Sequence, residues 1–232
     1  MKHLQKYIVI TLLFISITSI RLYAQTAPHI WLGGFAGVDI GNITITGTDL
    51  SGATFSSKTG FAVGAEFDGF FSDNFGICAQ LAYVQKGTNE NINFGFGTTT
   101  SAVTLSYLQI PVLLKVTFGS GNFKPVFFAG PEIGIKLSAS QKLSEGGKDT
   151  TATIPDSLLT TINLGIMFGA GVTYAINPTT MLFLNAAYDL GLSNLNARYG
   201  KGSGSSVDNE KDITNDIRIN LGIVFGLGKD ND

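Results

Sequence analysis

Large apolar side chains alternate with small or polar ones along most of this chain, with a period of two residues. The segment 216–227 shows the pattern: Ile, Leu or Phe fills every odd position, while Asp216, Arg218, Asn220 and Gly222 fill the even ones. A period of two is typical of β-strands with two unlike faces, whereas helices repeat every 3.6 residues. The pattern therefore predicts an all-β protein.

Eight segments carry this alternation, each at least as long as the ~9–11 residues that a tilted strand needs to cross a bilayer. They are 29–40, 59–71, 75–88, 102–118, 124–138, 161–175, 180–193 and 214–228.

The connections between these segments alternate in length. Tight turns are expected at 72–74, 119–122 and 176–179, and long polar connections at 41–58, 89–101, 139–160 and 194–213. Short periplasmic turns and longer external loops are typical of even-stranded outer-membrane barrels. The chain is therefore expected to be an eight-stranded antiparallel up-and-down transmembrane β-barrel with both termini on the periplasmic side.

The first 24 residues have the features of a secretory signal peptide. Lys2 and Lys6 precede an apolar stretch at 8–20, and Ala24 offers a small residue for cleavage. A membrane anchor would need about 20 apolar residues, and Arg21 interrupts the run. Residues 1–24 are thus predicted to direct export to the outer membrane of a Gram-negative bacterium, and 25–232 to form the barrel domain.

The width of the barrel decides which face points inward. The interior of an eight-stranded barrel is just wide enough for modest side chains, so the Gly-rich, charged face is expected inside and the large apolar face in lipid. A soluble lipocalin-like barrel would reverse the two faces. The expected interior polar network consists of Asp39, Glu66, Asp68, Lys115, Glu132, Lys136, Asp189, Asp216 and Arg218. It is interpreted as a structural plug of paired charges, with a narrow polar conduit or ligand site as the alternative.

Aromatic side chains on the outward face are expected near the strand ends, where they would form an interfacial girdle. Those flanking the short turns are Phe71, Phe75, Phe118 and Tyr174.

The candidates for catalysis or metal binding are few. His29 is the only histidine after the signal segment, and it is placed at the rim with no predicted serine partner. Cys78 is expected to be a small interior packing residue, and the acidic run at 208–212 lacks a calcium-loop pattern. No enzymatic activity, cofactor or metal is therefore expected. A formal net charge of −2 gives no reason to expect a nucleic-acid partner.

Four segments carry a resemblance to a known family: Tyr83–Gly87, Tyr107–Lys115, Ala129–Glu132 and Gly169–Gly171. In this order and spacing the chain resembles the PorT-type outer membrane β-barrel proteins of Bacteroidetes-like bacteria. The resemblance implies an eight-stranded outer-membrane barrel, and some members of that family are linked to protein secretion and gliding.

The chain departs from that family in two respects. Gln80 and Gln109 stand where the family usually has acidic residues, so two interior charges are neutral here. The chain also ends on polar residues after Gly228, and not on the aromatic residue common in outer-membrane proteins.

The expected role is that of a non-enzymatic structural or interaction barrel with a plugged polar interior and four long external loops. Its expected partners are outer-membrane lipid and other envelope proteins that contact these loops. The alternatives are a small-solute porin or transporter, and a component of a protein-secretion apparatus.

Overall fold

The computed structural model describes residues 30–46, 53–93, 98–119, 121–145, 148–197 and 211–227. The predicted signal peptide and His29 lie outside these residues. The strands are β1 (Ile30–Thr46), β2 (Ala53–Phe70), β3 (Phe75–Asn93), β4 (Thr98–Thr117), β5 (Phe123–Glu145), β6 (Lys148–Thr153), β7 (Ile162–Asn177), β8 (Thr180–Gly191) and β9 (Lys211–Gly226), with a short 3-10 helix η1 (Asp156–Leu158). Among the described residues, no helix is long and apolar enough to span a membrane.

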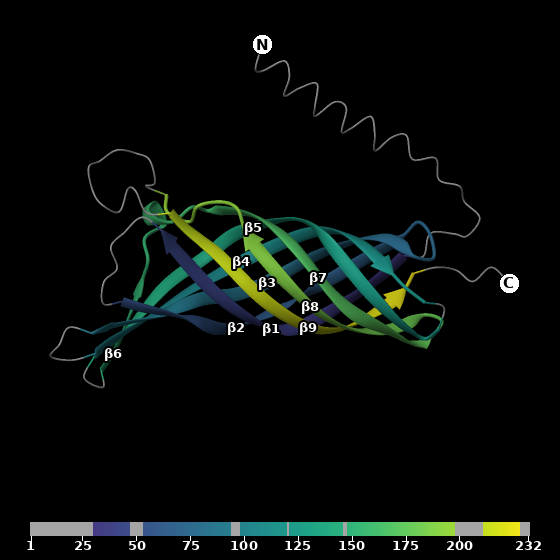
Figure 1. The fold of residues 1–232 in the computed structure, drawn as a ribbon, viewed down its shortest axis with the longest axis horizontal. Helices are drawn as coiled ribbons and strands as arrows, with labels where there is room; N and C mark the ends of the chain where they lie inside the picture. The colour runs from purple at the N-terminus through teal and green to yellow at the C-terminus, as the bar shows by residue number, and fades with distance from the viewer. Residues whose placement is uncertain are drawn as a thin grey trace, which may run out of the picture.

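Eight of these strands close into an antiparallel barrel (Figure 1). Consecutive strands pair with each other, β5 pairs with β7, and β1 closes the cylinder on β9 from Trp31↔Gly226 to Thr46↔Lys211. The remaining strand, β6, pairs only with β5 and forms a β-hairpin with it. The structure thus confirms the expected eight-stranded antiparallel barrel.

The two ends of the barrel differ, and we call them the turn end and the loop end. The turn end carries the short connections at 71–74, 118–122 and 178–179. The first of these is closed by a bond from Phe71 N to Phe75 O of 3.1 Å, and Gly119 adopts φ 89° in the second. Strand β9 finishes at the turn end, whereas β6 lies at the opposite, loop end (Figure 1).

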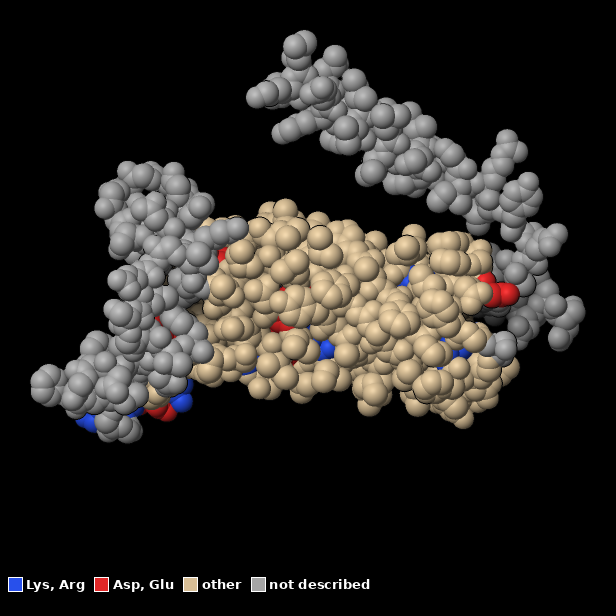
Figure 2. Space-filling view, viewed as in Figure 1, with Lys and Arg blue, Asp and Glu red and all other residues tan. Residues whose placement is uncertain are grey.

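The outer wall of the barrel is apolar. Leu221 is 61% exposed and Leu114 is 52% exposed, and they belong to a wall of exposed large hydrophobic side chains. A large contiguous apolar surface marks contact with a membrane or another protein. On the face of the barrel seen in Figure 2, few atoms of Lys, Arg, Asp or Glu reach the surface between the two ends. Near the turn end, Phe71, Phe75, Phe118 and Tyr174 are all exposed on this wall. The large apolar face therefore points outward, as expected for a wall that contacts lipid.

Most strands are longer than the sequence pattern predicted, mainly at the loop end, whereas β8 ends at Gly191 and not at 193. The expected end of the first strand at 40 is wrong because β1 continues to Thr46, and β5 continues beyond 138 to Glu145. The expected long connections are therefore partly strand. Beyond Ile40 and Leu137 the outward positions become polar, as at Thr44 and Lys142, so the apolar alternation stops while backbone pairing goes on.

These extensions build an open sheet beyond the barrel. Pairing between β1 and β2 ends at Gly41↔Lys58, whereas β2, β3, β4 and β5 stay paired to their loop ends. Strand β6 adds to β5 from Ser140↔Thr153 to Glu145↔Lys148. We call the resulting five-stranded structure, β2-β3-β4-β5-β6, the external sheet.

A charged residue on the apolar wall should destabilise the barrel. Leu221→Arg places a guanidinium near the middle of the apolar stretch of β9, and we expect it to lower the free energy of unfolding by about 2–4 kcal/mol. Urea unfolding in phospholipid vesicles measures this change. Thr150→Arg, on the exposed β6, is the matched control and should change stability by less than about 0.5 kcal/mol. Equal effects of the two substitutions would show that Leu221 does not face lipid.

Candidate functional site

The interior of the barrel is the candidate site, because the alternation of each strand directs its polar side chains there. All nine side chains of the expected polar network are buried, and none is more than 7% exposed. Eight of them lie in two groups inside the barrel, and the ninth, Lys136, lies at the loop end.

The first group, the turn-end cluster, lies close to the turns. The ammonium of Lys115 on β4 contacts Glu66 Oε1 at 3.0 Å and Asp68 Oδ2 at 2.7 Å, both on β2. Gln80 Nε2 on β3 donates to Glu66 Oε2 at 2.8 Å. The neutral amide thus satisfies a carboxylate oxygen that a second acidic residue at position 80 would repel.

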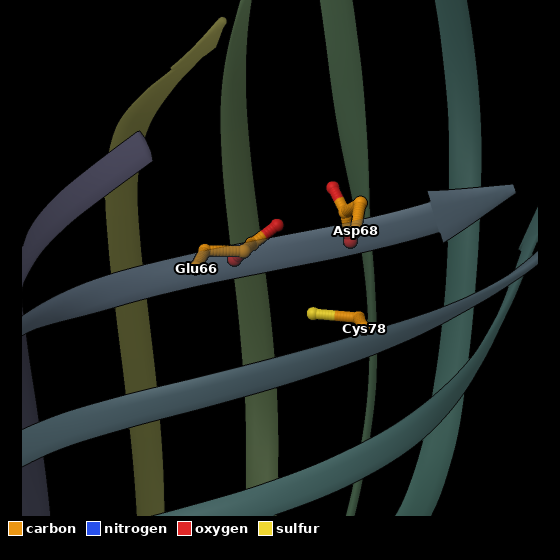
Figure 3. Close-up of side chains that lie close together, drawn as sticks. All are labelled: Glu66, Asp68 and Cys78. Carbon is orange, nitrogen blue, oxygen red and sulfur yellow. The ribbon is translucent and has the colours of Figure 1, made fainter. Parts of the chain in front are cut away.

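The side chains of Glu66, Asp68 and Cys78 point into the same part of the interior (Figure 3). Their ligand atoms lie within 4.8 Å of one another, which is a spacing that a metal ion can use. The Lys115 ammonium, however, already bonds to both carboxylates and is itself only 3% exposed. Lys115 is therefore the cation of this cluster, and Cys78 packs against Leu113 and Met167 in the adjoining apolar core.

The second group, the central cluster, lies farther from the turns and joins strands from all around the barrel. Arg218 Nε on β9 donates to Asp39 Oδ2 on β1 at 3.1 Å, and its Nη2 donates to Gln109 Oε1 on β4. Gln109 Nε2 in turn donates to Asp189 Oδ2 on β8 at 3.1 Å. The amide of Gln109 therefore connects a guanidinium to a carboxylate, a link that an ionised acidic side chain could not make to Asp189.

Lys86, which was not among the expected interior residues, completes the central cluster. Its ammonium bonds to Asp216 and lies 3.3 Å from Asp189 Oδ2, and its side chain is 1% exposed. The ring of Tyr107 lies beneath it, with 5.3 Å from Nζ to the ring centroid. Position 86 has the same parity as Cys78 and Gln80 on β3, so the alternation alone could have placed it inside.

Carboxyl groups outnumber cations in the two clusters. Asp39, Glu66, Asp68, Glu132, Asp189 and Asp216 share Lys86, Lys115 and Arg218. Glu132, on β5, is 3% exposed. Six buried carboxyl groups thus lie in the barrel interior with three cations.

Apolar side chains fill the space around the two clusters. Arg218, Tyr107, Lys86, Phe183, Leu113 and Met167 are among the largest side chains that are less than 2% exposed. Inward glycines make this filling possible: a Cβ at Gly222 would lie 2.3 Å from Phe183 Cζ, and one at Gly41 would lie 2.8 Å from Asp216 Oδ1. Large side chains thus occupy the middle of the lumen.

The loop end of the lumen is covered by two segments of the chain, 154–160 and 193–197. Leu195 is 2% exposed and belongs to an apolar cluster with Ile43, Leu105 and Tyr107. Thr160 N donates to Leu195 O at 2.7 Å and joins the two segments. Lys136 binds this cover through Leu159 O and Asp156 Oδ1, both at 3.1 Å. Lys136 therefore bonds to the cover at the loop end, whereas the other eight residues lie in the two clusters inside the barrel.

The turn end is more open. A recess of about 530 Å³ enters there between the turns, lined by Trp31, Phe70, Phe183 and Thr173 among others. Its polar lining includes Lys115 and Asp68, so it ends on the turn-end cluster. Neither histidine of the chain is among the described residues, nor are residues 208–210 of the acidic run.

Breaking one buried ion pair should be costly. Arg218→Met leaves the Asp39 carboxylate without its cation, and we expect a loss of about 3–5 kcal/mol in the free energy of unfolding. The double variant Asp39→Asn, Arg218→Met should recover part of that loss because no uncompensated charge remains. Lys142→Met breaks the exposed Lys142–Asp149 pair and is the control, with an expected loss below about 1 kcal/mol. Urea unfolding in vesicles compares the three, and equal losses for the two single variants would contradict the buried pairing.

The exposed pair on the β5–β6 hairpin predicts a pH effect. Hydrogen bonds from Lys142 Nζ and from the hydroxyl of Ser144, each 2.7 Å, lower the pKa of Asp149. A lowered pKa means that the pair stabilises the hairpin above the ordinary Asp pKa of about 3.9 and that this contribution is lost as the pH falls through the lowered value. An NMR titration of the Asp149 carboxyl should give a midpoint below the ordinary one. A midpoint at or above it would show that these bonds do not form.

Several solved structures are similar to this chain. The chain is similar to the outer membrane protein OprG from Pseudomonas aeruginosa, with 16% identity over 88% of this chain and 97% of that chain and a TM-score of 0.50. Two further similar structures are outer membrane protein W from E. coli (17% identity, 88% and 100% coverage, TM-score 0.45) and Neisserial surface protein A (13%, 84% and 96%, TM-score 0.45). No curated protein matches the sequence.

The family comparison covers most of the barrel. A family model described as the outer membrane protein beta-barrel domain matches residues 23–197. This stretch runs from the residues before β1 through β8 and includes most of both polar clusters. The chain therefore belongs to the outer membrane protein beta-barrel domain family, and it is a protein of the bacterial outer membrane.

Proposed function

We propose that this protein is a non-enzymatic barrel with a sealed interior, which presents its loop end to other molecules of the cell envelope or cell surface. The observation that carries the proposal is the complete burial of large side chains in mid-lumen, where Arg218, Tyr107 and Lys86 are all less than 2% exposed. A pore that passes solutes needs a continuous open passage along its whole length. Here large side chains from several strands meet in the middle of the lumen.

The cover over the loop end supports the same proposal. Leu195 and Leu159 lie over the mouth, and Lys136 ties the cover to the barrel wall. Material entering from the turn-end recess would meet the turn-end cluster, then the central cluster, then this cover. With short turns on the periplasmic side, the external sheet lies outside the cell and is not embedded in lipid.

Within the family, we further propose that the chain is of the PorT type. The support is the set of four sequence segments described above. In the structure one of them, Tyr107–Lys115, contributes Tyr107, Gln109 and Lys115 to the two polar clusters.

Single-channel recording tests the sealed interior. We expect purified protein in a planar bilayer to show no stepwise conductance, because the middle of the lumen is filled. The double variant Tyr107→Ala, Arg218→Ala removes two of the largest interior side chains and should open a passage that conducts. The single variant Thr150→Ala, on exposed β6, serves as the control and should stay silent.

Conductance through the wild-type protein would contradict a sealed lumen. Stepwise conductance of the wild-type protein that Lys115→Ala or Arg218→Ala alters would show that ions pass through the clusters. The protein would then be a small-solute porin, and the sealed-barrel proposal would be wrong.

A further inference from the structure

The external sheet ends on a strand with one unpaired edge. Strand β6 pairs with β5 over six residues, and all six of its residues are exposed. Among the described residues, no backbone group bonds to the other side of β6. A strand edge of this kind presents N–H and C=O groups that another strand can pair with.

The register identifies which groups are free. In an antiparallel pair, residues that exchange hydrogen bonds alternate with residues that do not. Ile154 N donates to Ala139 O at 3.0 Å, and Ile154 and Ala139 continue the register of Ser140↔Thr153. Counting back along β6, the backbone groups of Ala152 and Thr150 face β5. The N–H and C=O groups of Asp149, Thr151 and Thr153 therefore face away from the sheet.

Two features that often protect such an edge, a proline and a bulge, are missing from these six residues, whose register with β5 is continuous. The lysine of the strand, Lys148, is its first residue and lies at the β5–β6 turn. The carboxylate of Asp149 bonds to Lys142 and Ser144 of β5, so it is held on the paired side and does not screen the free edge. Three of the six residues are threonines, which favour extended backbone.

Symmetry decides against a second copy of the protein as the occupant. Antiparallel pairing of two identical strands needs a twofold axis perpendicular to the strand. Two copies inserted in the same direction in one membrane are related only by an axis along the membrane normal. Strand β6 runs antiparallel to β5, a barrel strand tilted about 35–45° from that normal, so the two requirements conflict.

We propose that the free edge of β6 binds an extended segment of another polypeptide, which adds a sixth strand to the external sheet. Backbone hydrogen bonds from Asp149, Thr151 and Thr153 provide the affinity, as in other cases of strand addition. The partner segment is polar and extended, with no proline at the positions that face β6. This inference rests on the proposed function only in that the loop end is exposed outside the membrane; it does not depend on whether the lumen conducts.

A synthetic peptide can serve as the probe. The sequence of residues 138–145 already pairs with β6 on its other side, so a fluorescein-labelled peptide of that sequence has the right pattern. Its fluorescence anisotropy is measured with the full-length protein in lipid nanodiscs. Thr151→Pro removes the central N–H of the free edge, at a position where proline does not interrupt pairing with β5. Thr151→Val keeps that N–H and is the matched control.

We expect the wild-type protein and Thr151→Val to bind the peptide alike, and Thr151→Pro to bind it about tenfold more weakly. Equal binding by all three proteins, or no binding by the wild type at about 1 mM peptide, would overturn the proposal. Dimerisation of the wild type that Thr151→Pro abolishes, without peptide binding, would also overturn it and assign the edge to a second copy.

A variation of the peptide leaves the protein unchanged. N-methyl groups on every second amide of the peptide should abolish binding, whereas N-methyl groups on the alternate amides should not, because only one set faces β6. If the two methylated peptides behave alike, no strand is added. Conductance recordings report on the lumen alone, so failure of the strand-addition proposal and failure of the sealed-barrel proposal can be told apart.

Discussion

The need to satisfy every backbone N–H and C=O group within lipid determines the rest of this structure. No water is available there, so a sheet must close on itself, and β1 does so on β9 through sixteen residue pairs. Closure with eight strands gives a narrow lumen. The narrow lumen requires the inward face to combine glycine with a few large side chains, and it requires charges on that face to be paired. The outward face must then carry the apolar residues that a soluble protein would bury.

Much of this could be predicted from the sequence, because lipid on one side and a narrow lumen on the other give the two faces opposite compositions. The alternation placed Asp216, Arg218 and Asn220 inside and their neighbours outside, and the structure agrees. The turns were predictable because turn-forming residues are concentrated in them. The pairing partners were not, since the same interior residues allow many arrangements of three cations among six carboxyl groups.

The strands at the loop end could not be predicted from the sequence. Once a strand leaves the membrane, both of its faces contact water, and an alternation of polarity no longer distinguishes strand from loop. Residues 139–145 and 148–153 are rich in Ser, Thr and Lys and were expected to be loop, although they form the β5–β6 hairpin. Lys86 is a different case, because it lies within the predicted strand 75–88 and has the inward parity. Its ammonium reaches Asp189 and Asp216 across the lumen.

The sequence separation of the buried pairs has a consequence for assembly. Asp39 and Arg218 are 179 residues apart, and Lys86 and Asp216 are 130 apart. A chain that has inserted only its first strands would carry Asp39 and Glu66 into the bilayer without Arg218. The cost of those charges would oppose partial insertion, and it disappears only when the last strand arrives and joins the first. The charges that fill the finished barrel therefore favour concerted insertion, in which the strands meet before any of them is committed to the lipid.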